Sequence, residues 1–289
     1  MNFVSIRGKT VQILFPIFAI LAFAGCVTVG PTTPVTQTLD GGITQVALTI
    51  PVTGGKYVKA DMYLPASPTP SPGILVFPTY YAMLYGRSEN FDRAYALALT
   101  KLGYATLVPA LSQHGRRAYH PAHGLDMVAI SQWFRARPEV MDDRIGGVGF
   151  SAGAYHAGVL AASDPATRAI VGYYGPYDSA KFAIWSEDKA TALTNYPGKI
   201  NGAVLLLSGD KDDETVFNQH AEPLNRGLKS AGKNVELVVY PGDYHRFDRG
   251  PADVANGNET STGHVHRLNP ASRDDAWRLT TEWLKKYMY

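Results

Sequence analysis

The stretch that most constrains this chain is the Gly-x-Ser-x-Gly motif Gly149-Phe150-Ser151-Ala152-Gly153. It lies between an apolar run, 144–150, and an alanine-rich segment, 152–162, which together predict a strand, a sharp turn and a helix. Such a turn strains the backbone of the serine, so the positions two before and two after it must carry almost no side chain. The motif therefore predicts that the Ser151 hydroxyl projects from a strand end at a helix N-terminus, where negative charge is stabilised.

Strand and helix patterns alternate along the rest of the chain. Two runs of alternating polarity, 43–50 and 57–64, flank a Gly-Gly turn and predict an N-terminal antiparallel hairpin at a sheet edge. The alternation that follows predicts an α/β fold with a doubly wound, mostly parallel sheet. Loops after the parallel strands should gather at one crevice. Buried strands are expected at 73–77, 104–108, 168–174, 203–208 and 235–240, and helices at 88–102, 127–134, 216–228 and from Ser272, where Ser272 and Asp275 fit a capping box.

The N-terminus resembles a bacterial lipoprotein signal. Arg7 and Lys9 precede an apolar stretch, 11–23, which is too short to span a membrane and leads through small residues to Cys26. We expect a signal peptide over 1–25, a lipid on Cys26, a flexible tether over 26–42 and one domain over 43–289. The protein would then be anchored at the cell envelope, on the periplasmic or the outer-membrane face. An ordinary signal peptide or a buried N-terminal helix is the alternative.

Charge and cysteine content limit the possible partners and cross-links. Residues 1–25 contain two of the 27 Lys and Arg and none of the 25 Asp and Glu, so the remaining chain has balanced charges. Such balance argues against a nucleic-acid partner, which would require a basic face. The single cysteine excludes an internal disulfide. No feature of the sequence predicts the oligomeric state.

A serine nucleophile needs a base in hydrogen-bond reach and an acid that orients the base. The expected loop after 203–208 contains Asp210, Asp212 and Asp213, and the loop after 235–240 contains His245. Ser151, an acid near position 212 and His245 thus follow the chain order Ser, Asp, His that accompanies an elbow serine in this type of sheet. Among the other histidines, we expect His156 to be packed or capping behind the elbow and His220 to be solvated, while His114, His120 and His123 follow the 104–108 strand.

At this point the chain resembles the α/β-hydrolase fold and, within it, the dienelactone hydrolase-like group. The resemblance runs from about residue 57 to the C-terminus and rests on the elbow, on Gly-Asp-Lys-Asp at 209–212 and on the stretch 240–248 around His245. It implies a hydrolase that cleaves esters or lactones through an acyl-enzyme, with Asp212 as the acid and Asp213 as the alternative. The group carries a cysteine where this chain has Ser151, and a glutamate where it has Pro78-Thr79-Tyr80-Tyr81. A serine esterase is therefore the expectation, rather than a dienelactone hydrolase in the strict sense.

The oxyanion hole would take one backbone N–H from Ala152 and one from the loop after 73–77, either Tyr80 or its neighbours Thr79 and Tyr81. Tyrosines of two crevice loops could form an aromatic wall for the substrate, although packing at strand ends is an equal alternative. These candidates are Tyr81, Tyr85, Tyr174 and Tyr177.

The sequence predicts neither a cofactor nor a metal. His264-Val265-His266 resembles a metal-binding pair, but no third ligand follows it closely in the chain, and Asp210 and Glu214 are expected to be solvated. The favoured function is a lipid-anchored serine hydrolase acting on a small ester or lactone. The alternatives are a non-catalytic envelope lipoprotein that binds through the same scaffold, and a peptidase or polysaccharide deacylase with the same triad.

Overall fold

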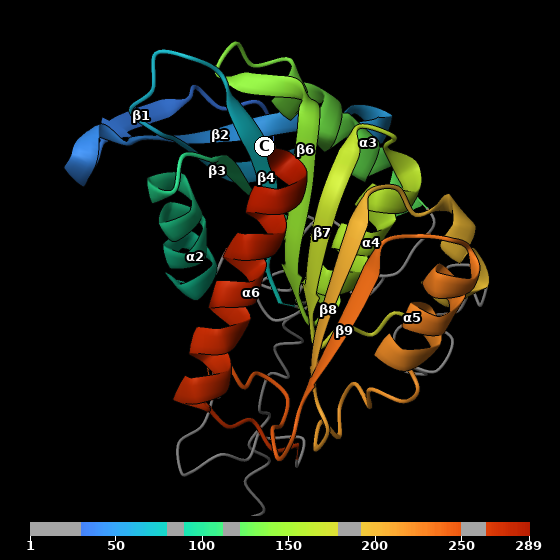
Figure 1. The fold of residues 1–289 in the computed structure, drawn as a ribbon. Helices are drawn as coiled ribbons and strands as arrows, with labels where there is room; N and C mark the ends of the chain where they lie inside the picture. The colour runs from blue at the N-terminus through green and yellow to red at the C-terminus, as the bar shows by residue number, and fades with distance from the viewer. Residues whose placement is uncertain (1–29, 80–89, 112–121, 179–191, 250–263) are drawn as a thin grey trace, which may run out of the picture.

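The structure is a computed structural model that describes residues 30–79, 90–111, 122–178, 192–249 and 264–289 (Figure 1). The predicted signal peptide and Cys26 lie outside the described residues. Among the helices that are described, none combines the length and the apolar character needed to cross a bilayer.

One nine-stranded sheet runs through the molecule, with the strand order β1-β2-β3-β5-β4-β6-β7-β8-β9 (Figure 1). Pairing is antiparallel from β1 to β5 across β2 and β3, and parallel from β5 through β4 to β9. The expected N-terminal hairpin and the mostly parallel sheet are both present. The strands are β1 Val35–Thr38, β2 Thr44–Val52, β3 Lys56–Leu64, β4 Ser71–Phe77, β5 Ala105–Ala110, β6 Val140–Phe150, β7 Thr167–Tyr173, β8 Ala203–Gly209 and β9 Val235–Tyr240.

Helices cover both faces of the sheet, as a doubly wound fold requires. Helices α2 and α6 pack on one face, and α3, α4 and α5 pack on the other, each group over its own apolar cluster (Figure 1). β4 is buried along its whole length because helices enclose it on both sides, which explains the apolar run over residues 73–77. The helices are α2 Asn90–Lys101, α3 Ala122–Arg135, α4 Ala152–Ser163, α5 Ala221–Ser230 and α6 Pro270–Met288.

Several details differ from the sequence-based expectations, including the start of α3, which is Ala122 rather than residue 127. Part of the predicted 26–42 tether is a sheet strand, since β1 pairs with β2 through backbone hydrogen bonds that composition does not reveal. Helix α5 begins at Ala221 rather than at residue 216. Helix α6 begins at Pro270, and its N-cap is Asn269, whose side chain accepts from the N–H of Ala271. The Ser272 capping box is therefore wrong, because proline at the first helical position starts the helix two residues earlier.

The turn between β6 and α4 has the geometry that the Gly-x-Ser-x-Gly motif predicts. Ser151 has φ 54° and ψ −120°, a strained backbone conformation for a residue with a side chain. A Cβ atom on Gly149 would overlap the carbonyl group of Gly153, and one on Gly153 would overlap the carbonyl oxygens of Phe77 and Pro78. The two glycines therefore allow α4 to start against the strand it follows and against the end of β4.

We expect Gly153→Ala to destabilise the protein by about 1–3 kcal/mol, the usual cost of forcing extra atoms into a packed site. Gly198→Ala is the matched control because Gly198 is exposed and a Cβ there meets nothing within 4 Å. The free energy of unfolding, measured by denaturant titration, should fall for the first variant and stay within about 0.5 kcal/mol of wild type for the second. Equal stability of the two variants would contradict the close approach.

Candidate active site

Ser151 is fixed at the carboxyl edge of the sheet by backbone hydrogen bonds to neighbouring elements. Its N–H donates to the carbonyl of Tyr173 at the end of β7 (2.9 Å), and its own carbonyl accepts from the N–H of Ala154 in the first turn of α4 (2.9 Å). The residue is only partly buried. The strained turn thus presents a rigid, accessible hydroxyl group.

His245 lies in the loop after β9 and contacts this hydroxyl. Its Nε2 is 3.1 Å from Ser151 Oγ, and its Nδ1 is 2.8 Å from Asp212 Oδ2. An ionised carboxylate only accepts hydrogen bonds, so Nδ1 carries the proton and Nε2 of the neutral ring is left as an acceptor. The serine hydroxyl can then donate to Nε2, which is the arrangement that general-base activation of a serine requires.

Asp212 is buried and surrounded by donors. Its Oδ1 accepts from the backbone N–H groups of Glu214 (3.0 Å) and Thr215 (2.7 Å), and its Oδ2 also lies 2.7 Å from the Thr215 hydroxyl. Burial raises the pKa of Asp212, but the charge of His245 and these hydrogen bonds outweigh burial and lower the pKa below its ordinary value. Of the two acids that sequence left open, Asp212 contacts His245, whereas Asp213 lies 3.5 Å from His264.

The loop that contains His245 is held by a buried ionic network. The Arg249 guanidinium lies 3.1 Å from Asp92 Oδ1 in α2 and 3.3 Å from Asp248 Oδ2, and it stacks over the ring of Phe150. Asp248 also accepts from the Tyr174 hydroxyl (2.7 Å). Since charges this deeply buried are stable only when paired, the network fixes the loop to α2 and to the end of β6.

Two groups that the sequence did not assign to the site lie beside His245. Glu214 Oε2 is 3.7 Å from His245 Nε2 and 2.8 Å from His266 Nε2. Glu214 is partly buried rather than solvated. Burial alone would raise the pKa of Glu214, but the charge of His245 and the hydrogen bond to His266 lower this pKa to about 2. Burial opposes the charged form of His245, but Asp212 and Glu214 together raise the pKa of His245 above its ordinary value. Only folding unites these residues, because no local motif connects Glu214 to His266.

The remaining site predictions have mixed outcomes. Ala152 is the first residue of α4, so its N–H has no acceptor within the helix, which is a property that an oxyanion donor needs. Tyr174 and Tyr177 are both fully buried, which is the packing alternative, although the Tyr174 ring meets the His245 ring edge-on at 4.6 Å. Tyr80, Tyr81 and Tyr85, which include two of the three oxyanion candidates in the loop after β4, lie outside the described residues.

Two other histidines are buried. His156 is packed in α4, with Nδ1 2.9 Å from the carbonyl oxygen of Ala152, as expected. The prediction that His220 is solvated is wrong, because it is buried at the start of α5 and its Nδ1 accepts from the N–H of Asp178. His114, His120 and the side chain of His123 lie outside the described part of the chain.

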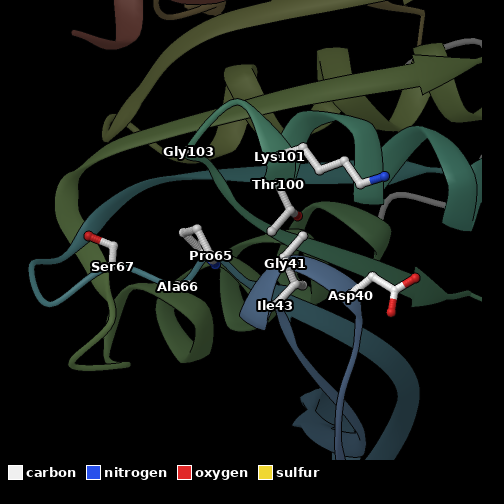
Figure 2. Close-up of a pocket in the computed structure, with 9 residues that line it drawn as sticks. All are labelled: Asp40, Gly41, Ile43, Pro65, Ala66, Ser67, Thr100, Lys101 and Gly103. Atoms are coloured by element: carbon white, nitrogen blue, oxygen red, sulfur yellow. The ribbon is translucent and has the colours of Figure 1, made fainter.

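A separate hollow of about 600 Å³ opens at the other end of the sheet (Figure 2). It lies between the end of α2, where Thr100 and Lys101 contribute, and the segment before β4, where Pro65 and Ser67 contribute. Both segments precede parallel strands, whereas Ser151 and His245 follow them. The hollow is therefore remote from the triad-like cluster, and its lining contains no histidine or cysteine.

Comparisons with known proteins place the chain in a family. The family model described as "Dienelactone hydrolase family" matches residues 58–288. Two relatives carry the name "Putative carboxymethylenebutenolidase". One, from Escherichia coli (strain K12), is 26% identical over 139 residues, which are 48% of this chain and 45% of the relative. The other, from Methylorubrum extorquens, is 25% identical over 257 residues, which are 82% of this chain and 79% of the relative.

The match to the Escherichia coli protein thus spans less than half of that relative's length. Among solved structures, a dienelactone hydrolase-like promiscuous phosphotriesterase from metagenomic libraries aligns with a TM-score of 0.66, at 18% identity, over 85% of this chain and 99% of the other. That likeness supports the α/β-hydrolase fold. The extent of the family match shows that this chain is a hydrolase-fold protein that belongs to the dienelactone hydrolase family.

Proposed function

We propose that the protein is a serine hydrolase that cleaves carboxylic esters or lactones through an acyl-enzyme. The observation that carries the proposal is the continuous chain of contacts from Ser151 Oγ to His245 Nε2 (3.1 Å) and from His245 Nδ1 to Asp212 Oδ2 (2.8 Å). Membership of the dienelactone hydrolase family supports hydrolysis as the reaction class.

In the acylation step, Ser151 Oγ attacks the substrate carbonyl carbon while its proton passes to His245 Nε2. The carbonyl oxygen becomes negative and accepts from the N–H of Ala152 and from a second donor in the loop after β4. When the carbon–oxygen bond to the leaving group breaks, His245 returns the proton to that oxygen. In a lactone the leaving oxygen stays attached to the acyl chain. Water, activated by the same imidazole, then releases the acid and restores Ser151.

Asp212 orients the ring and stabilises the imidazolium that forms in both steps. The hydroxyl of Thr215, 3.3 Å from Nδ1, adds a further contact on the same side of the ring. Because Glu214 faces the opposite nitrogen, the imidazolium lies between two carboxylates. This arrangement favours transfer of the serine proton to the ring.

The test of the proposed function is Ser151→Ala. The wild-type chain should hydrolyse a short p-nitrophenyl ester and react covalently with a fluorophosphonate probe, and the variant should do neither because it lacks the nucleophilic oxygen. Undiminished labelling of the variant would refute the assignment. Absence of any reaction in the folded wild type would instead favour a non-catalytic binding protein. A panel of lactones, esters, peptides and acylated sugars, ranked by kcat/KM, separates the substrate classes.

Two aspartate variants test which acid orients His245, and one serves as the control for the other. Asp212→Asn should lower kcat by up to ~10⁴-fold, because the amide disfavours the ring orientation that leaves Nε2 free to accept. Asp213→Asn should keep wild-type kcat, since Asp213 is exposed and contacts His264 instead. Equal losses in the two variants would contradict the role of Asp212.

The pH dependence of kcat/KM should shift in Glu214→Gln. His245 must be neutral to accept the serine proton, so kcat/KM falls as the pH drops through the pKa of His245 in the free enzyme. Glu214 raises this pKa, and its removal should move the acid limb of the profile to lower pH. Asp213→Asn should leave the limb in place. An unchanged limb in Glu214→Gln would show that the Glu214 charge does not act on the base.

We also propose that a lipid on Cys26 holds the enzyme at the cell envelope. The support is the lipoprotein-like sequence of residues 1–26. When the full chain is expressed in a bacterium, it should partition into the detergent phase of a Triton X-114 extract, and Cys26→Ala should partition into the aqueous phase. Identical partitioning of the two proteins would argue against the anchor.

A further inference from the structure

Three side chains from three separate segments bring metal-ligand atoms together beside Ser151. One ligand atom from each of Glu214, His245 and His266 lies within 4.8 Å of the other two. Glu214 follows β8 and His245 follows β9, while His266 precedes α6 and forms a parallel β-bridge with His245. The two histidines are buried, and the Glu214 side chain is 24% exposed. The group therefore has a buried imidazole side and a partly exposed carboxylate.

This donor set matches the preferences of zinc. Two imidazoles and one carboxylate form one of the three-residue sets that bind Zn²⁺ and leave a fourth position open. With Zn–N and Zn–O bonds of about 2.0–2.2 Å, ligand atoms in a tetrahedral site lie about 3.4 Å apart. Glu214 Oε2 lies 2.8 Å from His266 Nε2 and 3.7 Å from His245 Nε2, distances that bracket this value. Rotation of the Glu214 side chain changes both of these distances, and the ligand atoms of the three residues all lie within 4.8 Å of one another.

The surroundings of His245 also suit a metal ligand. A histidine that binds metal usually donates its other ring N–H to a carboxylate, which fixes the tautomer and the ring orientation. His245 makes this contact through Nδ1 to Asp212 Oδ2 at 2.8 Å. His266 Nδ1 is buried and has no hydrogen-bond partner among the described residues. When a metal takes Nε2 of His266, this nitrogen must carry the ring proton, and the described residues offer it no acceptor.

We propose that Glu214, His245 and His266 bind a Zn²⁺ ion that inhibits the enzyme. His245 Nε2, the atom that would bind the metal, is also the atom that lies 3.1 Å from Ser151 Oγ. One lone pair cannot bind zinc and accept the serine proton at the same time, so metal binding and catalysis exclude each other. Inhibition by zinc rests on the proposed serine hydrolase activity. Zinc binding at these three residues does not depend on that activity.

Binding is measured by calorimetric titration of ZnCl₂ into chelator-treated Ser151→Ala protein, so that it does not depend on activity. We expect one Zn²⁺ per chain at this site. Glu214→Gln, which keeps the side-chain shape, and His266→Ala should each weaken binding by at least ~10-fold, since even supporting residues change metal affinity by ~10- to 100-fold. His264→Ala is the matched control, because His264 belongs to the same His-x-His sequence but faces Asp213.

Inhibition is measured with the wild-type Ser151 protein. Zn²⁺ should suppress both ester hydrolysis and fluorophosphonate labelling, at a half-inhibitory concentration that agrees with the calorimetric dissociation constant, and a chelator should restore both. Circular dichroism identifies any variant that does not fold. If His266→Ala does not fold, the zinc affinity of Glu214→Gln alone tests the site. No zinc binding by the folded protein, or equal affinity in Glu214→Gln and His264→Ala, would overturn the site. Zinc binding without esterase activity in any condition would instead count against the proposed function and leave the site standing.

Discussion

The candidate active site at the carboxyl edge of the sheet depends on one close contact, between the β6–α4 turn and the end of β4. Ser151 adopts a strained conformation that persists only because the surrounding backbone fixes it. Gly149 and Gly153 make the approach possible, since a side chain on either would overlap a carbonyl group. The Ser151 N–H also donates to the carbonyl of Tyr173 at the end of β7, and the Ser151 carbonyl accepts from the N–H of Ala154 in α4. Contacts with the sheet and with α4 therefore fix the position of the Ser151 hydroxyl.

Paired charges determine the rest of the site. His245 lies between Asp212 and Glu214, and the same loop is attached to α2 through Arg249 and Asp92. Each ion is costly to bury alone and is stable here because its partner is fixed in the right geometry. The arrangement stabilises a protonated imidazole, which suits the role that we propose for His245 as the base in acyl transfer. It also gathers the ligands that would allow a metal to compete for that base.

Tertiary contacts explain where the sequence-based expectations failed. The Ser272 capping box was wrong because Pro270 starts α6 earlier, with Asn269 as the cap. Residues 35–38 belong to a strand because an exposed segment can pair along an open sheet edge whatever its hydrophobic pattern. His220 is buried because the end of the segment after β7 folds over it and donates the N–H of Asp178. Each of these outcomes depends on a partner that is distant in the chain or on competition between overlapping local signals.

The sequence by itself determined the strand–turn–helix at Ser151, the alternation that gives a mostly parallel sheet, and the order of the loops that carry Asp212 and His245. The spacing of apolar residues and the residue types of a turn are local properties of the sequence. The carboxyl ends of parallel strands necessarily meet at one edge of the sheet. Only the tertiary structure distinguished Asp212 from Asp213 as the partner of His245 and brought Glu214 and His266 to that histidine. Neighbouring residues in a loop can point in opposite directions, and contacts between distant segments depend on packing that no local pattern records.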